Sequence, residues 1–421
     1  MHISLVEFSV ENYKVFKERA VFSMLARKND KHTFESNGEN LLKTSLIYGP
    51  NASGKTSLLD AFSLIKAGII VSANLSTNPK DRLGIPYFPF LGLKNTQTEP
   101  SSFEVVFSTK GSYSGVYRYG FSILPDRITK EQMSVVLANG KEEILFSRTE
   151  QKIAVSGNVF ASVKDLTETT RKEALFLSTA AQINNKFALG IVGAFRDINI
   201  ISGVRGQYEE FTIRKFKEDP EYKTRILEYL KTADFCIFDG LTEEIDVPAL
   251  DEIKDDADSF SARKRMEKGN VLIFKHPVYG EDKKKIDDFK LLLEDESTGT
   301  QKFLSVLGPI IDTLIEGKVL FIDEFDNSLH PFLTKLTIDL FESSEINKKD
   351  AQLIVTTHDV SLLSYKDDFI KDQFWFTEKD ELGAAKLFSL AEFKLRNDTE
   401  FSKKYLEGRF GALPFVIPLE K

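Results

Sequence analysis

Hydrophobic and polar residues alternate along much of the first 150 residues, and this alternation predicts β-strands. Apolar residues take every second position in ISLVEFSVENY, RAVFSML, SSFEVVFST, GVYRYGFSIL and KEEILFSR. Turns containing Gly, Pro or Asn separate these segments. Period-two strands that follow one another closely are typical of antiparallel pairing, so we expect an antiparallel sheet in the N-terminal part.

Further along, apolar residues recur three and four positions apart, which is the spacing of a helix face. TRKEALFLSTAAQINNKFALGIVGAF and EYKTRILEYLKTA show this pattern, and so does GTQKFLSVLGPIIDTLIEG, which Gly317 ends. Continuous apolar runs in TSLIY, KVLFIDEF and AQLIVTTHD predict buried strands. Buried strands separated by helices indicate a mostly parallel sheet covered on both faces.

The predicted fold is therefore α/β, with a mixed sheet, antiparallel N-terminal strands, helices on both faces and a helical insertion. We expect an N-terminal lobe over 1–160, a helical insertion with a connecting segment over 161–290, and a C-terminal lobe over 291–421. The connecting segment includes a charged stretch of weak periodicity, VPALDEIKDDADSFSARKRMEKGN, followed by a strand, NVLIFKHPVY.

Composition narrows the class of protein. With 42% hydrophobic and 29% charged residues and no long apolar run, the 421-residue chain is expected to be soluble, cytoplasmic and not membrane-bound. The single cysteine, Cys236, excludes a disulfide framework and is expected to be a buried apolar residue. A net charge of −8 argues against a basic protein that coats nucleic acid regardless of sequence. Acids interrupt the basic clusters at 263–268 and 283–285, which are expected to be solvated.

The strongest motif is IYGPNASGKTSLL, which fits the G-x-x-x-x-G-K-[ST] phosphate loop with a strand before it and a helix after it. Small residues allow the backbone N–H groups to surround a phosphate, a lysine reaches the β/γ-phosphates, and a hydroxyl ligates Mg²⁺. The motif thus predicts ATP and Mg²⁺ as cofactors. The expected nucleotide-binding residues are Gly49, Asn51, Ala52, Ser53, Gly54, Lys55, Thr56 and Ser57, with Thr56 also a metal ligand.

Two acids end the buried strand in VLFIDEFD, at the edge where parallel sheets place catalytic groups. We expect Asp323 to hold Mg²⁺, directly or through water, and Glu324 to orient and deprotonate the attacking water. His358 ends another buried strand and is either a structural residue or a sensor of the γ-phosphate charge. His330 is expected to shape a turn before Pro331.

The segment LEDESTGTQKF places Ser297 and Gly299 just before a long amphipathic helix. A small, polar turn at a helix N-terminus is either an anion site or a plain helix cap, and both readings remain open here.

The order of P-loop, ESTGT, LFIDEFDNSLHP and TTHD resembles the ATP-binding-cassette heads of the SMC/RecF/OLD group. FSVENYKVFKE, DEFDNSLHP, DQFWFTEKDELGAAKLFSL and YLEGRFGALPF are further similar to bacterial AAA-type ATPases related to RloA, one half of RloA/RloB-type phage-defence pairs. This likeness covers most of the chain and is weakest between residues 235 and 290. It implies an ABC-type P-loop ATPase head.

The resemblance also implies roles for single residues. Ser297 and Gly299 stand in the signature loop, which would contact the γ-phosphate bound to the other subunit. Asn327 and Ser328 fall in the loop that would face the partner head, and His358 stands at the switch-histidine position.

Other positions depart from the family pattern. Asn12 and Lys14 in NYKVF match a family pattern that usually carries Arg, and here Lys14 stands in place of that Arg. Lys14 is a candidate nucleotide contact, although a lysine cannot make the two parallel hydrogen bonds that an arginine makes to a phosphate. Gln97 in KNTQTEP is the candidate for the water- and metal-positioning glutamine. Thr298 and Thr300 replace the Gly-Gly-Gln signature of transporters.

A signature that acts in trans implies that two ATP molecules are buried between two heads, and that hydrolysis separates them. We therefore expect a homodimer or higher homo-oligomer. The leading hypothesis is a defence ATPase that senses a phage protein or foreign nucleic acid and controls an effector encoded nearby. That effector could dock on YLEGRFGALPF, a segment that could equally be a buried tail.

The alternative is a RecF-like DNA clamp in repair or chromosome maintenance, which needs a basic surface on the dimer. A P-loop kinase or GTPase is disfavoured, because the sequence has no evident phospho-acceptor site.

Overall fold

A computed structural model describes residues 1–73, 85–202, 208–233, 235, 237–248, 266–327, 329–395 and 400–413. The chain divides into two compact units. Unit 1 comprises Met1–Val204, Thr313–Asn327 and Thr337–Lys421, and unit 2 comprises Arg205–Asp312 and Ser328–Leu336. The boundaries expected at residues 160 and 290 lie inside unit 1 and unit 2, respectively.

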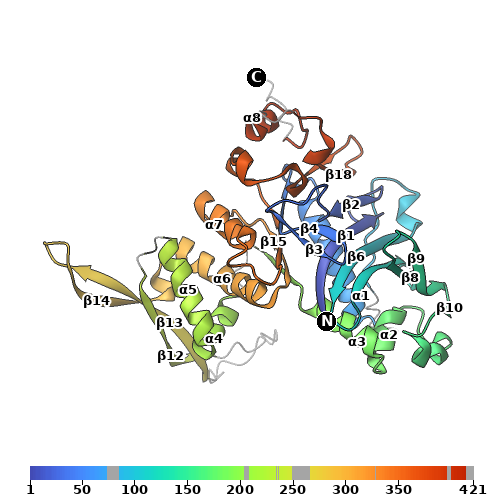
Figure 1. The fold of residues 1–421 in the computed structure, drawn as a ribbon, viewed down its shortest axis with the longest axis horizontal. Coiled ribbons are helices and arrows are strands. Elements are labelled where there is room, and N and C mark those ends of the chain that lie inside the picture. Colours follow the sequence, from blue (N-terminus) through green and yellow to red (C-terminus); the bar gives the residue numbers. More distant parts are fainter. Residues whose placement is uncertain are drawn as a thin grey trace, which may run out of the picture. The chain divides into compact units, whose positions relative to one another are not determined.

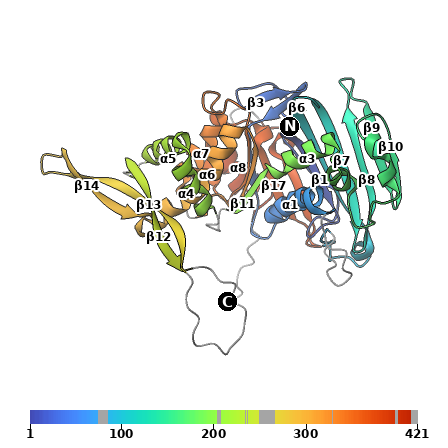
Figure 2. The ribbon, with the colours of Figure 1, turned by 90° about the horizontal axis from the view of Figure 1, so that it is seen from below.

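Within the described part of unit 1, seven strands form an antiparallel sheet in the order β10-β9-β8-β7-β6-β1-β2 (Figure 2). The strands are β1 (His2–Glu11), β2 (Ala20–Ser23), β6 (Ser101–Lys110), β7 (Gly115–Leu124), β8 (Arg127–Val136), β9 (Glu142–Thr149) and β10 (Lys152–Val155). The alternation predicted this sheet, since Phe8, Phe103 and Phe121 turn into the core while their neighbours face outward. A short hairpin, β3 (Thr33–Ser36) with β4 (Glu39–Leu42), is a separate two-stranded sheet that packs Phe34 and Leu41 against Val6 and Val106 of the larger sheet.

A second sheet in unit 1 has the order β11-β15-β16-β5-β17-β18. Its strands are β5 (Thr44–Tyr48), β11 (Asn199–Ser202), β15 (Val319–Asp323), β16 (Gln352–Thr356), β17 (Phe374–Lys379) and β18 (Ala385–Ser389). All neighbours pair in parallel except β17 and β18, which confirms the predicted mostly parallel sheet. The carboxyl ends of β5, β15 and β16 therefore meet at one edge.

Helix α1 (Lys55–Val71) packs between the two sheets of unit 1. Its Phe62 ring lies 5.1 Å from the ring of Phe8 on β1 and 4.5 Å from that of Phe321 on β15. Against α1 pack α2 (Phe176–Gln182) and α3 (Lys186–Arg196), the two halves of one predicted helical stretch. Asn185 divides them, because its side chain accepts the Ala188 N–H and caps α3.

The C-terminal segment of unit 1 packs on β17 after the short helix α8 (Phe401–Leu406). Tyr405 and Phe410 are buried against Phe376, and the Ala412 N–H donates to Glu378 at 3.2 Å. Buried side chains thus anchor the segment up to residue 413, while residues 406–409 are exposed, and both predicted alternatives stay predictions. Pro414 and Phe415 lie outside the described residues.

Unit 2 contains α4 (Glu209–Glu218), α5 (Pro220–Thr232) and the sheet β12 (Asp239–Pro248), β13 (Met266–Tyr279), β14 (Lys285–Leu292) (Figure 1). The insertion is thus helical in part, as predicted, and also carries an antiparallel sheet. Helices α6 (Thr298–Glu316) and α7 (Pro331–Glu342) each have residues in both units. Cys236 and residues 263–265 lie outside the described part, whereas residues 283–285 are exposed, as expected.

Candidate nucleotide site

The loop between β5 and α1 is tightly packed at its two glycines. A Cβ atom on Gly49 would lie 2.3 Å from the hydroxyl oxygen of Thr377. Gly54 has φ +121°, and a Cβ there would lie 3.1 Å from side-chain atoms of Val15 and of Ala385. Only glycine fits these two positions, and the loop backbone lies close against its support. The Ser53 hydroxyl bonds that of Thr377 at 2.6 Å.

This loop has the features of a phosphate cradle. Helix α1 begins at Lys55 with no acidic residue in its first turn, so its free N–H groups and dipole favour an anion. The Lys55 ammonium donates to the carbonyls of Gly49 at 2.8 Å and Pro50 at 3.2 Å. The loop and first turn hold the predicted residues Asn51, Ala52, Ser53, Gly54, Thr56 and Ser57.

The predicted acids at the end of β15 lie beside α1. The Thr56 hydroxyl donates to one carboxylate oxygen of Asp323 at 2.8 Å, and the Thr356 hydroxyl donates to the other at 2.5 Å. The Glu324 N–H donates to the Thr356 hydroxyl at 2.7 Å. Thr356, which our prediction missed, thus joins both acids. The available signal was its position as the first residue of TTHD, at the end of a strand parallel to β15.

Backbone conformation sets Glu324 apart from the strand β15 that precedes it. Its φ is +50°, in the left-handed region that non-glycine residues rarely adopt. The Asn327 N–H closes a turn onto the Glu324 carbonyl at 3.1 Å. Strain of this kind at the end of a strand is typical of functional positions.

His358 lies at the same edge. Its backbone N–H donates to both carboxylate oxygens of Asp326, at 3.1 and 3.2 Å. His358 keeps contact with solvent, yet partial desolvation is the largest cause that lowers its pKa, and the Lys55 charge lowers it further. The carboxylates of Asp326, Glu324 and Asp323 oppose this shift. The imidazole is therefore neutral at pH 7 and able to donate one hydrogen bond.

Desolvation also lowers the pKa of Lys55, and the same three carboxylates oppose the shift. Lysine, acids and histidine thus form one electrostatic group at the carboxyl edge of the sheet.

The donor set suits Mg²⁺. Thr56 and Asp323 supply a hydroxyl and a carboxylate oxygen, the hard donors that this ion prefers, and Mg²⁺ sites beside phosphates need only one or two carboxylates. In the part of the chain that the structure describes, no group of three His, Cys, Asp or Glu side chains could hold a metal. Phosphate oxygens and water would therefore complete the coordination.

Two predicted residues have other partners. The Lys14 ammonium pairs with Asp60 on α1 at 2.5 Å and lies 5.6 Å from the Tyr13 ring centroid. Gln97 donates to the Leu91 carbonyl at 3.1 Å and shares no hydrogen bond with Thr56 or Asp323.

Asn12 is buried and ties together the loop that carries Gln97. Its side-chain amide donates to the carbonyls of Thr96 and Glu99, both at 2.8 Å. The role of Lys14 in nucleotide contact and that of Gln97 at the metal remain predictions.

The signature residues belong to unit 2. The Ser297 hydroxyl accepts the Thr300 N–H at 3.1 Å and bonds the Thr300 hydroxyl at 2.8 Å, so Ser297 caps α6. Gly299 is open, since the nearest atom to an added Cβ is 3.8 Å away. The helix-cap reading is thus realised, and contact with a phosphate stays a prediction. Asn327 is exposed, and Ser328 lies outside the described residues.

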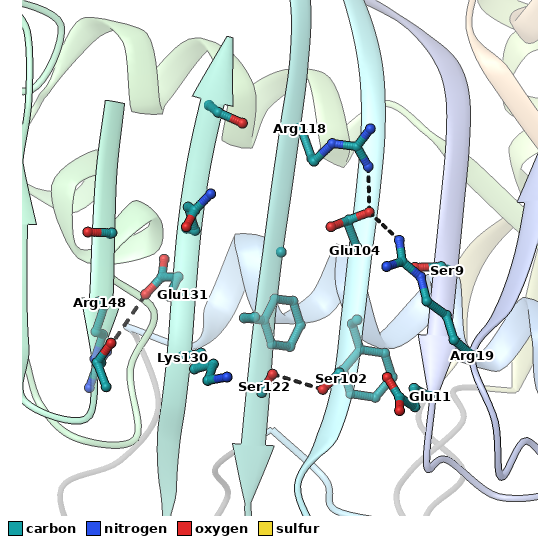
Figure 3. A pocket seen from close by; sticks show the side chains of 17 residues that line it. Ser9, Glu11, Arg19, Ser102, Glu104, Arg118, Ser122, Lys130, Glu131 and Arg148 are labelled. Atoms are coloured by element: carbon teal, nitrogen blue, oxygen red, sulfur yellow. Dashed lines mark hydrogen bonds and ion pairs between the residues drawn. The ribbon is translucent and has the colours of Figure 1, made fainter. Parts of the chain in front are cut away.

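A polar groove of about 440 Å³ lies on the antiparallel sheet and contains none of the predicted site residues (Figure 3). Arg118 and Arg19 both reach Glu104 at 2.6 Å, and Arg118 also bonds Glu142 at 2.8 Å. Because these guanidinium groups are neutralised by carboxylates, the groove is a poor phosphate site.

Comparisons with known proteins agree with this geometry. The family described as "AAA domain, putative AbiEii toxin, Type IV TA system" matches residues 45–174 and 279–364, just over half of the chain. No curated protein matches. Among the described helices, none has the length and apolar character needed to span a membrane.

Three solved structures are also similar, each at 14% identity and over 92% of this chain. The SMC head domain from Thermotoga maritima is covered to 99% with a TM-score of 0.39. An SMC head bound to the C-winged helix domain of ScpA is covered to 97% with a TM-score of 0.41. The recombination mediator RecF is covered to 98% with a TM-score of 0.32.

Proposed function

The chain belongs to the family described as "AAA domain, putative AbiEii toxin, Type IV TA system", and on that premise we propose that it is an ABC-type P-loop ATPase that hydrolyses ATP to control a partner effector. In this proposal ATP brings two copies together head to head, and hydrolysis separates them. The assembly acts as the sensor and scaffold of an anti-phage defence system.

One observation carries the ATPase proposal: a continuous chain of hydrogen bonds from Thr56 through Asp323 and Thr356 to Glu324. It connects the helix that would hold the phosphates with the acid that would act on water. When bound, Mg²⁺ would neutralise phosphate charge. Thr56 and Asp323 would hold the ion, and Lys55 would reach the β/γ-phosphates.

In this arrangement Glu324 accepts the proton of the attacking water, and neutral His358 donates a hydrogen bond toward the terminal phosphate. Neither role needs any residue of unit 2 from the same chain. The Ser297–Gly299 turn is instead proposed to complete the site of a second copy. Its exposed position at the N-terminus of α6 supports this, since a helix N-terminus attracts anions.

Control of an effector is supported by the family description and by the resemblance at both ends of the chain. The family description names a toxin of a toxin–antitoxin system, a context in which two proteins act as a pair. Together with the RloA-like segments at both ends of the chain, this favours an ATPase whose output lies in another protein.

The ATPase proposal is tested by phosphate release and by mass from light scattering. We expect Glu324→Gln to slow hydrolysis by about 10²–10⁴-fold while the protein still forms a dimer with Mg²⁺–ATP, because only the general base is lost. Lys55→Ala should abolish both signals. Glu345→Gln, an exposed acid outside the site, is the matched control. Hydrolysis at the wild-type rate by Glu324→Gln would refute the assignment.

The effector proposal is tested separately. Glu324→Gln protein is purified with ATP from cells that carry its neighbouring genes, and we expect a second protein in the complex. The RecF-like clamp would instead be supported by a homodimer that carries no second protein and binds duplex DNA only in the presence of ATP. Its affinity for DNA should then fall as salt is added.

A further inference from the structure

The β13–β14 hairpin of unit 2 has an exposed edge. Strand β13 pairs with β12 through Met266–Lys275 and with β14 through Ile273–Tyr279, so the hairpin is two-stranded beyond Lys275 (Figure 1). Residues 285–290 of β14 are all exposed, and the apolar Phe289 is 48% exposed. An exposed strand edge with apolar side chains is a template for pairing with another chain.

The two edges of this ribbon differ. Pro277 lies opposite Asp288 and has no N–H, so this pair is one of the non-hydrogen-bonded pairs of the antiparallel ladder. Pro277 therefore leaves a missing donor on its own outer edge and protects that edge. In a non-hydrogen-bonded pair the backbone N–H and C=O of both residues point away from the partner strand, so those of Asp288 point to the outer edge of β14. The pattern repeats every two residues, so the N–H and C=O of Lys290 also point to this edge. In agreement, the Asp288 N–H donates to the Asp287 side chain at 2.8 Å.

We propose that this free edge of β14 pairs antiparallel with β14 of a second copy of the chain. A two-fold axis perpendicular to the sheet keeps each side chain on the same face in both copies. Three central registers then satisfy the outward backbone groups: one centred on Asp288, one on Phe289 and one on Lys290. The first sets Asp288 against itself and the third sets Lys290 against itself, and directly opposed like charges destabilise a sheet.

The register centred on Phe289 is complementary. It places Asp288 opposite Lys290 of the second copy, and this pair occurs twice because of the symmetry. Phe289 faces its own counterpart in a non-hydrogen-bonded pair, where side chains approach most closely. Within one chain the Phe289 ring stacks on His276 at 5.0 Å, which leaves its other face for the partner. The irregularity in the ladder lies near Ile286, outside the residues that this register uses.

This contact involves residues of unit 2 alone and needs no nucleotide. A chain that also associates head to head through ATP would have two separate self-interfaces. Two different two-fold contacts on one subunit generate assemblies larger than a dimer.

The contact is tested on the full chain by sedimentation velocity without nucleotide and with EDTA, conditions under which the proposed ATP-driven association is absent. We expect a concentration-dependent dimer. Asp288→Lys should weaken it by about tenfold or more, and adding Lys290→Asp should restore it, because the opposite charges are regained. Glu281→Lys, in the exposed hairpin turn, changes the charge by the same amount as Asp288→Lys and is the control.

A monomer at every concentration, or a dimer that Asp288→Lys leaves unchanged, overturns the proposal. The ATPase and the ATP-driven dimer of Glu324→Gln are unaffected by either result, so the two proposals fail separately.

The register itself is tested by cross-linking in a Cys236→Ser background. Phe289→Cys should form a disulfide-linked dimer on oxidation, since residues facing each other in a non-hydrogen-bonded pair have Cβ atoms about 4.5–5.5 Å apart. Asp287→Cys, which would face Leu291 of the second copy, should not cross-link. Equal cross-linking at both positions would exclude the register centred on Phe289.

Discussion

At the scale of single residues, Thr356 holds the two candidate catalytic acids in place. Its hydroxyl donates to Asp323 and accepts the Glu324 N–H, so Thr356→Val leaves that N–H without its acceptor. We expect hydrolysis to fall about tenfold or more and the free energy of unfolding to fall by about 1–3 kcal/mol. Phosphate release and urea unfolding measure the two effects. Thr356→Ser keeps the hydroxyl and should keep most of the wild-type hydrolysis rate and stability. Losses as large as those of Thr356→Val would mean that the methyl group, and not the hydroxyl, is responsible.

Close packing requires a glycine at position 49. Gly49→Ala would place a methyl group 2.3 Å from the Thr377 hydroxyl oxygen and 2.5 Å from the Thr377 carbonyl oxygen, so the loop would have to move. We expect loss of ATP binding and a lower melting temperature, measured by calorimetric titration and thermal unfolding. The matched control is Gly193→Ala in α3, where an added Cβ meets no atom within 4 Å. That control should be stabilising by roughly 0.5–1 kcal/mol, because alanine favours a helix.

His2 gives the fold a dependence on pH. Burial lowers the pKa of His2 from its ordinary value of 6.5; Lys110 lowers it further, while the Gly317 backbone and Asp350 raise it. The unfolded chain therefore binds more protons than the folded chain just below pH 6.5. Stability is complete above that pH and declines as the pH falls through the folded pKa. Urea unfolding between pH 7.5 and about pH 5 should show a shallower decline in His2→Gln than in wild type.

Residues that belong to a sequence motif could be predicted individually, whereas the residues that contact candidates outside a motif could not. The spacing of Gly49, Gly54 and Lys55 carries their chemistry. The pairing of Lys14 with Asp60 depends on how a hairpin turn meets α1 in three dimensions, 46 positions along the chain. No local pattern reports such a contact.

At the scale of elements, strands with one buried apolar face could be predicted from alternating hydrophobicity. Strand β8 could not, because its buried face includes a charged residue. Glu131 on β8 points inward and is buried, where it accepts the Tyr119 hydroxyl at 2.9 Å and the Phe176 N–H at 2.7 Å. Burial raises the pKa of this carboxyl, and the hydrogen bonds and Arg148 oppose the shift. A charged residue on the buried face breaks the period of two. The contacts that compensate for it lie on other elements.

The cap of α6 separates two roles of Ser297. Ser297→Ala removes the side-chain acceptor and should cost about 1 kcal/mol of stability. Ser297→Asp keeps a good cap but would bring a negative charge toward a phosphate of the second copy. We therefore expect Ser297→Asp to retain stability and lose ATP-driven dimerisation, as measured by thermal unfolding and light scattering with Mg²⁺–ATP in a Glu324→Gln background. A normal ATP-dependent dimer in this variant would exclude the proposed trans contact.

At the scale of the whole molecule, the phosphate loop and the candidate catalytic acid Glu324 belong to unit 1, whereas the signature residues lie in unit 2, which has a core of its own. The rings of Phe303 on α6 and Phe235 lie tilted to each other with centroids 5.6 Å apart, and the Tyr222 hydroxyl bonds Asp312 at 2.7 Å. A ligand stabilises only the structure that must be folded to bind it. Binding of Mg²⁺–ATP should therefore protect unit 1 selectively.

Hydrogen exchange measured by mass spectrometry on Glu324→Gln provides the check. At an ATP concentration about 100 times the Kd, the free energy of opening of segments in β5, β15 and β16 should rise by about 2.7 kcal/mol where exchange requires unfolding of the site. Peptides from β12 and β13 should exchange at the same rate with and without ATP. Lys55→Ala serves as the control and should show no protection anywhere. Equal protection of β12 and β13 would mean that the two units unfold together, and that nucleotide binding is coupled to the whole chain.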